Sequence, residues 1–237
     1  MGTKAVILAG GFGKRLRPLT DTLPKSLLKV ADRPIIEWQI RWLASYGIKG
    51  VIVCAGYLKE RVVEELGSGI RIGVRLGYVF EDEPLGTAGA LKNAEHFLAG
   101  ERSFIVLNGD ILTDIDPTYV LSAAERHMAS MAVVPLPSPY GVVDIDELTG
   151  QVKGFREKPM LGEYWINAGV YALRGELLAE LPESGDLERE VFPKLAAQGQ
   201  LVAIRYEHCY WKSIDSHKDL EEASAHFREP RRSQAIT

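Results

Sequence analysis

The amino-acid sequence predicts an α/β fold with a largely parallel sheet and helices on both of its faces. Short runs rich in β-branched residues alternate with amphipathic helical patterns through residues 4–110. The connections between them are tight, as in parallel β-α-β units. The chain has 237 residues, of which 46% are hydrophobic, so it can bury a large core. That length suits one large domain or two small ones.

The first half of the chain supplies the alternating elements. Residues 4–8 (KAVIL) form an apolar run typical of a buried strand, and residues 10–20 follow as a glycine-rich loop. A helix is expected over residues 34–46, because Pro34 suits a first turn and apolar residues then recur at helical spacing. The next expected elements are strand 51–55, helix 58–66, strand 72–80, helix 86–98 and strand 103–107.

The pattern changes after a helix expected at residues 117–128. Pro, Gly and Asp turns then separate short strands, which indicates antiparallel additions to the parallel core. These strands are expected at 131–136, 142–146, 151–155 and 165–173, and two further strands are expected at 201–206 and 210–214. Asp186 is a good N-cap for a helix at residues 187–198. Ser216 and Asp219 form a capping-box variant that opens a last helix.

Charge and residue usage exclude several classes of protein. With 28 Lys+Arg against 32 Asp+Glu the net charge is −4, so no general field attracts nucleic acid or an anionic membrane. Cys54 and Cys209 are expected to be buried free thiols, because two distant cysteines make neither a disulfide framework nor a CxxC metal clip. No apolar run reaches the ~18 residues of a membrane span, and no secretory leader is visible, so a cytoplasmic location is expected. We expect one domain over residues 1–227 and a flexible tail over residues 228–237.

The strongest local signal is the glycine-rich loop that follows the first strand, with the sequence LAGGFGKRLRPLT over residues 8–20. Its three glycines let backbone N–H groups approach a phosphate, and three cations add positive charge at the same place. A P-loop is excluded because Arg15 stands where Ser or Thr is needed, and a dinucleotide fingerprint because Leu16 replaces its third glycine. The loop therefore indicates triphosphate binding of another type, or else a tight turn with solvated basic side chains.

This loop, with Pro24-Lys25 after it, resembles the signature G-G-x-G-T-R-L-x-P-L-T…P-K of nucleotide-sugar pyrophosphorylases, the sugar-1-phosphate nucleotidylyltransferases. Lys14 stands in place of the usual Thr. Further segments follow in family order: EPLGTAGA (83–90), NGD (108–110), YG (140–141), FREKP (155–159), INAG (166–169) and EVFP (190–193). The resemblance covers residues 4–226. It implies a Rossmann-like mixed sheet with antiparallel sugar-binding additions, and Mg²⁺-dependent transfer of a nucleotidyl group from a nucleoside triphosphate to a sugar 1-phosphate.

The resemblance also assigns roles to residues at matching positions. The expected catalytic residues are Arg15, Lys25 and Lys158. The expected nucleotide-binding residues are Leu8, Ala9, Gly10, Gly11, Gly13, Glu83, Pro84, Gly86, Thr87 and Ala88. The expected sugar-binding residues are Asn108, Gly109, Gly141, Glu157 and Asn167. Thr87 could equally cap the helix that begins there, and Asn167, which lies in an apolar run, needs a polar partner.

The expected ligands of Mg²⁺ are Asp110 and Asp215. Many relatives carry the second aspartate where Ser213 stands here. An offset of two residues keeps the same face of a strand, so Asp215 is expected to replace it. In the alternative reading, Asp110 is a simple turn residue and Asp215 merely precedes the Ser216 cap.

Substrate choice rests on the EPLGTAG segment, which is most similar to mannose-1-phosphate and heptose-1-phosphate guanylyltransferases. We therefore expect GTP and one of these sugar phosphates as substrates, and a homo-oligomer is an expected state. The alternatives are a UTP- or dTTP-dependent enzyme of glucose or N-acetylglucosamine 1-phosphate, a catalytically silent subunit that senses nucleotide-sugars, and a Rossmann oxidoreductase. No hexapeptide-repeat period is present, so a catalytic domain without an extension is expected.

Overall fold

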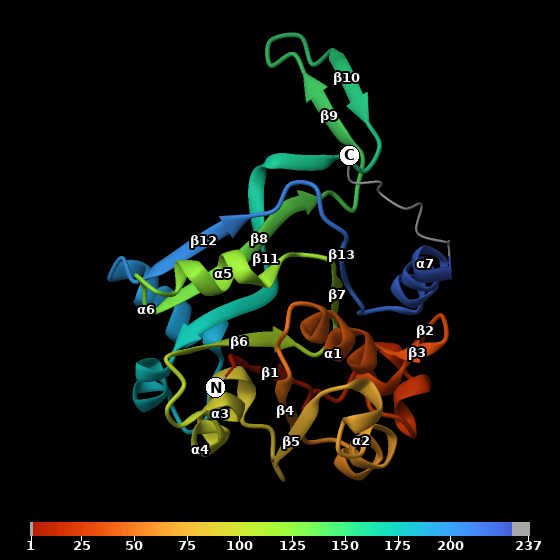
Figure 1. Cartoon of the computed structure of the whole chain (residues 1–237). Helices are drawn as coiled ribbons and strands as arrows, with labels where there is room; N and C mark the ends of the chain where they lie inside the picture. The colour runs from red at the N-terminus through yellow and green to blue at the C-terminus, as the bar shows by residue number, and fades with distance from the viewer. Residues whose placement is uncertain (1, 229–237) are drawn as a thin grey trace, which may run out of the picture.

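A computed structural model describes residues 2–228 of the chain and contains a central sheet of seven strands (Figure 1). The strand order is β12-β8-β11-β6-β1-β4-β5. Its parallel part is made of β1 (Lys4–Leu8), β4 (Gly50–Ala55), β5 (Arg75–Phe80) and β6 (Ser103–Asn108). Strand β11 (Met160–Arg174) is antiparallel to β6 and to β8 (Ala129–Pro137), and β12 (Leu201–Arg205) is parallel to β8. The predicted mixed α/β sheet is confirmed.

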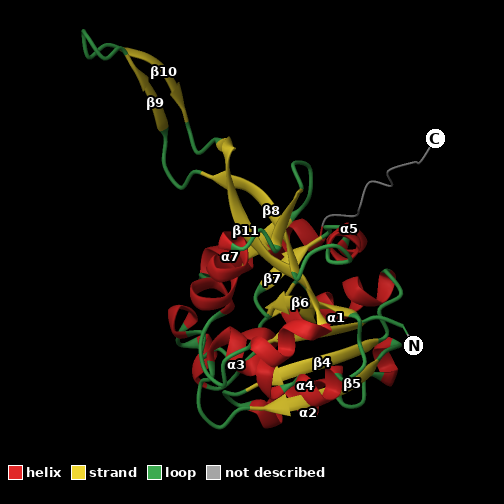
Figure 2. Ribbon diagram, turned by 90° about the vertical axis from the view of Figure 1, so that its left-hand side faces the viewer, coloured by secondary structure: helices red, strands yellow, loops and turns green. Residues whose placement is uncertain are grey.

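Helices cover both faces of this sheet (Figure 2). One apolar cluster contains side chains of α1 (Ile35–Ser45), α2 (Lys59–Leu66) and α5 (Pro117–Ala123). A second cluster contains side chains of α3 (Gly86–Asn93), α4 (Glu95–Leu98) and α6 (Phe192–Ala197). Successive strand residues point to opposite faces, so Ala5 and Ile7 belong to the first cluster and Val6 to the second. A third cluster packs Leu16 of the glycine-rich loop against α7 (His217–Arg228), which anchors the loop.

Three small antiparallel pairs accompany the main sheet. Strand β2 (Lys29–Val30) pairs with β3 (Arg33–Pro34), and β7 (Ile111–Thr113) pairs with β13 (Trp211–Ser213). Strands β9 (Val142–Ile145) and β10 (Val152–Arg156) form a hairpin that projects from the body of the molecule (Figures 1 and 2). The antiparallel additions predicted for the second half are therefore present.

Several predicted boundaries are wrong. The helix expected at 86–98 is divided at Ala94, and the helix expected at 117–128 ends at Ala123, before β8 begins at Ala129. The strand expected from residue 72 begins only at Arg75, because Gly73 adopts a left-handed conformation (φ 80°) after a 3₁₀ turn. The expected loop 10–20 contains one 3₁₀ turn, Lys14–Leu16, and a second, Leu19–Asp21, begins at its end. Further 3₁₀ turns in the described residues are Lys25–Leu27, Ile70–Ile72 and Gly175–Glu180.

Of the two predicted N-terminal caps in the last part of the chain, the one at Asp186 is wrong and the one at Ser216 is confirmed. The helix expected at 187–198 begins as a π turn (Leu187–Val191), and the Asp186 side chain does not cap it. Instead Glu190 Oε1 accepts the Asp186 N–H at 3.1 Å. At α7 the capping box is confirmed, since Asp219 Oδ2 accepts the Ser216 N–H at 2.8 Å and Ser216 Oγ accepts the Asp219 N–H at 3.3 Å.

Both cysteines are free; Cys54 is buried, whereas Cys209 is only half-buried. Within residues 2–228 no helix is long and apolar enough to cross a membrane. The expected tail, 228–237, lies outside the described residues except for Arg228.

Candidate functional site

The glycine-rich loop opens into a cavity of about 290 Å³ at the carboxyl edge of the parallel strands. Ligands of α/β proteins bind at this edge. Gly109 follows β6 and passes so close to β1 that a Cβ on it would lie 2.6 Å from the Leu8 carbonyl oxygen. Predicted site residues make up most of the cavity wall: Leu8, Ala9, Gly10, Gly11, Lys25, Pro84, Gly86, Thr87, Asn108, Gly109 and Asp110.

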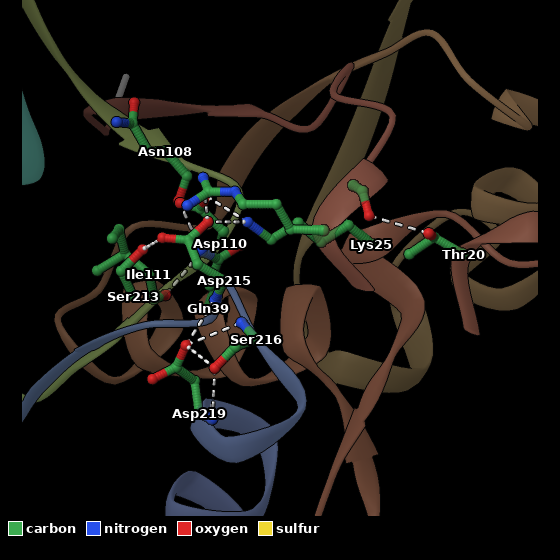
Figure 3. A network of polar contacts seen from close by, with 12 residues as sticks. Thr20, Lys25, Gln39, Asn108, Asp110, Ile111, Ser213, Asp215, Ser216 and Asp219 are labelled. Atoms are coloured by element: carbon green, nitrogen blue, oxygen red, sulfur yellow. Dashed lines mark hydrogen bonds and ion pairs between the residues drawn. The ribbon is translucent and has the colours of Figure 1, made fainter. Parts of the chain in front are cut away.

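Lys25, which lines this cavity, lies between two carboxylates (Figure 3). Its Nζ is 2.7 Å from Asp110 Oδ2 and 2.9 Å from Asp215 Oδ1. Arg15 also reaches Asp215 Oδ1, at 2.8 Å, and Ser213 donates its hydroxyl proton to Asp215 Oδ2 at 2.8 Å. Residues from three distant parts of the chain therefore meet at one point.

The pairing of two short strands explains why Asp215 lies next to Lys25. Strand β13 pairs with β7, and just beyond that pairing the Ile214 N–H donates to the Asp110 carbonyl at 2.9 Å. Burial raises the pKa of the Asp215 carboxyl, but hydrogen bonds from Lys25 and Ser213 lower it by more, so the net shift is downward. Asp215 therefore stays ionised at neutral pH.

These two carboxylates fit a divalent cation. Both already contact one cationic atom, so their oxygens converge on a common point, and hard carboxylate oxygens suit Mg²⁺. Among residues 2–228, His, Cys, Asp and Glu side chains form no cluster of three or more that could hold a metal. Substrate phosphates and water would supply the remaining ligands, as is usual for Mg²⁺.

Glu81 is a cavity residue that the sequence did not reveal. It follows β5 directly, and a Cβ on Gly10 would lie 2.0 Å from its Oε1. Burial raises the pKa of the Glu81 carboxyl, and the Leu85 N–H, which donates to Oε2 at 3.3 Å, partly opposes this. Glu83, the predicted residue, is exposed and does not line the cavity. The position of Glu81 at a strand's carboxyl end was the signal that could have identified it.

Thr87 is positioned by a loop distant in sequence. Helix α3 has no side-chain cap, so the capping reading of Thr87 is wrong. Its hydroxyl instead donates to Glu188 Oε2 at 2.6 Å and accepts the Leu187 N–H at 2.8 Å. Gly86 (φ 75°) allows the close contact with the same loop, since a Cβ there would lie 2.3 Å from the Gly185 carbonyl oxygen.

Ala88, Gly13 and Asn167, which were predicted to bind the nucleotide or the sugar, do not line this cavity. Ala88 is fully buried in the core. Gly13 (φ 61°) brings the loop against Lys25, whose Cβ would lie 3.0 Å from a Cβ on this glycine. Asn167 has the polar partners that its apolar surroundings require: Nδ2 donates to the Tyr171 hydroxyl at 2.7 Å, and Oδ1 accepts the Gly169 N–H at 2.8 Å.

Gly141, Glu157 and Lys158 lie together at the base of the β9–β10 hairpin. A Cβ on Gly141 would lie 3.0 Å from Glu157 Oε2, and Lys158 bends the chain with φ 45°. Because the hairpin projects from the body (Figure 1), the structure groups these residues with one another rather than with Lys25.

The sequence profile described as nucleotidyl transferase matches residues 4–229, almost the whole chain. The chain belongs to the nucleotidyl transferase family. The family prediction is thereby confirmed.

Two curated relatives of this chain carry the same name. It is 34% identical to the mannose-1-phosphate guanylyltransferase catalytic subunit beta of Danio rerio, over 98% of this chain and 66% of that protein. It is 38% identical to the protein of the same name from Drosophila pseudoobscura pseudoobscura, over 92% of this chain and 61% of that protein. The chain thus spans slightly less than two thirds of the length of these relatives.

Solved structures show the same fold. The nucleotidyl transferase superposes on HddC from Yersinia pseudotuberculosis with a TM-score of 0.77 and 26% identity, over 96% of this chain and 100% of that chain. It superposes on a putative glucose-1-phosphate thymidylyltransferase from Bacillus anthracis with a TM-score of 0.78 and 26% identity, over 97% and 96% of the two chains.

Proposed function

We propose that this nucleotidyl transferase transfers GMP from GTP to a sugar 1-phosphate, mannose- or heptose-1-phosphate, and releases pyrophosphate. The observation that carries the proposal is that one cavity joins the glycine-rich loop, Glu81, Lys25 and Asp110. In this cavity Glu81 could bind a base, the glycine-rich loop a triphosphate, and Asp110 a metal ion. The names of the curated relatives and the complex of HddC with GMP-PN support a guanine nucleotide.

The chemistry requires charge neutralisation rather than a base. A sugar phosphate oxygen attacks the α-phosphorus, a new P–O bond forms, and the bond to the bridging oxygen breaks so that pyrophosphate leaves. The attacking phosphate monoester is already largely a dianion at neutral pH, because its second pKa is about 6. Lys25 and Arg15 are placed to neutralise phosphate charge once they exchange their carboxylate partners for phosphates.

The family's divalent cation would bind at Asp110 and Asp215, and we propose Mg²⁺. When bound, such an ion supplies positive charge to the phosphates. Hydrogen bonds from Lys25 and Ser213 outweigh burial and hold the pKa of Asp215 below its ordinary value, and a negatively charged carboxylate suits this role.

Glu81 supports guanine as the base. An ionised carboxylate only accepts hydrogen bonds, and guanine presents two adjacent donors, N1–H and the N2 amino group. Uracil and thymine present a single N3–H between two carbonyl oxygens, and a carbonyl oxygen facing the carboxylate is unfavourable. The carboxylate of Glu81 therefore favours GTP over UTP or dTTP.

The sugar phosphate is proposed to lie near Asn108 and Asn167, with Glu157 and Lys158 as hydroxyl acceptor and phosphate-binding cation. The hairpin base would have to approach the cavity for the last two to act. The proposed partners of the protein are its two substrates, and we also propose that it self-associates. We propose one domain over residues 1–227, which the single seven-stranded sheet supports. A cytoplasmic location stays a prediction of the sequence.

The test is a matrix of five nucleoside triphosphates against mannose-, heptose-, glucose- and N-acetylglucosamine-1-phosphate, with Mg²⁺ present and pyrophosphate release measured. We expect the highest kcat/KM for GTP with mannose- or heptose-1-phosphate. If UTP or dTTP with a glucose phosphate gives the highest value, the substrate assignment is wrong. Absence of turnover with every pair would refute the enzymatic proposal and favour a silent subunit.

A further inference from the structure

Tyr171 carries a buried hydroxyl group between the two asparagines of the proposed sugar side. The residue lies on β11 and is 0% exposed. Its hydroxyl has three partners: Asn167 Nδ2 at 2.7 Å, Asn108 Nδ2 at 3.5 Å and Glu188 Oε1 at 3.1 Å. A hydroxyl group has one proton to donate and two lone pairs to accept. These three contacts therefore use its full capacity.

The direction of each hydrogen bond follows from the carboxylate. Glu188 can only accept, so the Tyr171 proton points to it. Burial raises the pKa of the Tyr171 hydroxyl, and the charge of Glu188 adds to this, so the proton is retained. Both asparagines must then turn their NH₂ groups toward Tyr171. Glu188 is held from its other side, because Thr87 donates to its Oε2 at 2.6 Å.

The amide oxygens consequently face away from Tyr171. Asn167 Oδ1 accepts the Gly169 N–H. Asn108 Oδ1 is buried, and no group within residues 2–228 donates to it. A buried acceptor without a donor is unfavourable, and Asn108 lines the cavity. A donor on a bound ligand is the partner that this oxygen requires.

The strand order indicates which ligand supplies this donor. Along the sheet the order is β11-β6-β1-β4-β5, and the glycine-rich loop follows β1 in the middle. Glu81, at the end of β5, lies on one side of that loop, whereas Asn108 on β6 and Asn167 on β11 lie on the other. With the triphosphate at the loop and the base at Glu81, the sugar of the second substrate lies beside Asn108.

We infer that Tyr171 is a positioning residue for the sugar phosphate: its hydroxyl orients the Asn108 amide so that Oδ1 accepts a hydroxyl proton from the sugar. This inference rests on the proposed function and names a residue that need not touch substrate. The hydroxyl group of Tyr171, rather than its ring, performs this role.

The decisive variant is Tyr171→Phe, which keeps the ring and removes the hydroxyl. We expect KM for the sugar 1-phosphate to rise about 10-fold, the loss typical of one hydrogen bond, while KM for the nucleotide and kcat stay nearly unchanged. Tyr206→Phe is the matched control, because the Tyr206 hydroxyl also donates to a single partner, the Asp116 carbonyl, but does not line this cavity. It should leave both KM values unchanged.

A series of deoxy-sugar 1-phosphates separates positioning from a general structural effect. The wild type should lose about 10-fold in kcat/KM on the analogue that lacks the hydroxyl bound by Asn108, and Tyr171→Phe should lose nothing further on that analogue. Asn108→Ala, which leaves Tyr171 intact, should show the same pattern if Tyr171→Phe does not fold. Equal losses on every analogue, or equal rises in both KM values, overturn the inference. A wild type without turnover on any substrate pair would instead refute the proposed function, and the inference with it.

Discussion

Replacing Glu81 by Gln should change which base the protein selects. A carboxylate offers guanine two acceptors, whereas an amide offers one acceptor and one donor. In the variant the NH₂ group would face one of the two guanine donors. Hydrogen bonds to a charged group contribute about 1.5–3 kcal/mol each, and the variant loses one and weakens the other. A loss of about 2.7 kcal/mol corresponds to about 10²-fold in kcat/KM for GTP.

The same substitution should favour pyrimidine nucleotides. One donor and one acceptor match the N3–H and an adjacent carbonyl of uracil or thymine, so kcat/KM for UTP or dTTP should rise about 10-fold. Steady-state pyrophosphate release with each nucleotide at a fixed sugar phosphate measures both changes. Glu83→Gln is the matched control, because Glu83 is an exposed acid two residues away, and it should leave the nucleotide preference unchanged.

Stability distinguishes loss of recognition from loss of the fold. The Leu85 N–H donates to the Glu81 carboxylate. In the Glu81→Gln variant it can still donate to the side-chain amide oxygen of the glutamine. Since burial raises the pKa of Glu81 above its ordinary value of 4.5, its contribution to stability is largest below that value and falls as pH rises through the folded pKa. Glu81→Gln should therefore gain stability relative to wild type across that rise in pH, measured by urea unfolding. An unchanged nucleotide preference in a folded variant would refute the assignment of Glu81 to the base.

Three further predictions concern the loop and the carboxylates. Asp110→Ala should lower kcat at least ~10²-fold, as loss of a charge-stabilising group commonly does; near-normal pyrophosphate release at saturating Mg²⁺ would remove Asp110 from the site. Gly10→Ala should raise KM for GTP by about 10-fold or more while the protein stays folded, because the new Cβ displaces the Glu81 carboxylate; circular dichroism and kinetics together check this. Asp215 has a lowered pKa, so the stability it contributes is present above its ordinary value of 3.8 and is lost as pH falls through the folded pKa. Asp215→Asn should lack that acid-dependent loss in urea unfolding, and an identical pH profile would contradict the ion pair with Lys25.

The sequence predicted the alternation of elements well because that signal is local. Apolar periodicity within a segment decides whether it becomes a strand or a helix, and a capping box such as Ser216–Asp219 involves neighbours only. Boundaries failed where a contact distant in sequence decides the outcome. The helix after Asp186 begins as a π turn, and its first residues are held by Thr87, a hundred residues earlier in the chain.

The candidate site was predicted where a motif fixes the backbone, and missed where a side chain is brought in from elsewhere. Gly10, Gly11 and Lys25 follow from the family signature, and they line one cavity. Glu81 and Glu83 look equivalent in the sequence, and only the end of β5 decides which one faces the cavity. In the sequence pattern Tyr171 cannot be told apart from the apolar residues of its strand, because its polar partners Asn108 and Glu188 lie 63 and 17 residues away.

The change of strand direction at β11 explains how the chain continues beyond the edge of the sheet. β6 ends at the edge, and the first residue of β11 that pairs with it is Val170, opposite Leu107. The preceding part of β11, residues 160–167, pairs with β8 instead and continues past the end of β6. A parallel strand would have stopped at the edge and given way to a loop. Because β11 is antiparallel and long, it carries the chain beyond the edge, and the residues before it include Glu157 and Lys158 at the hairpin base. The strands that looked like additions to a parallel core therefore build the proposed sugar side of the site.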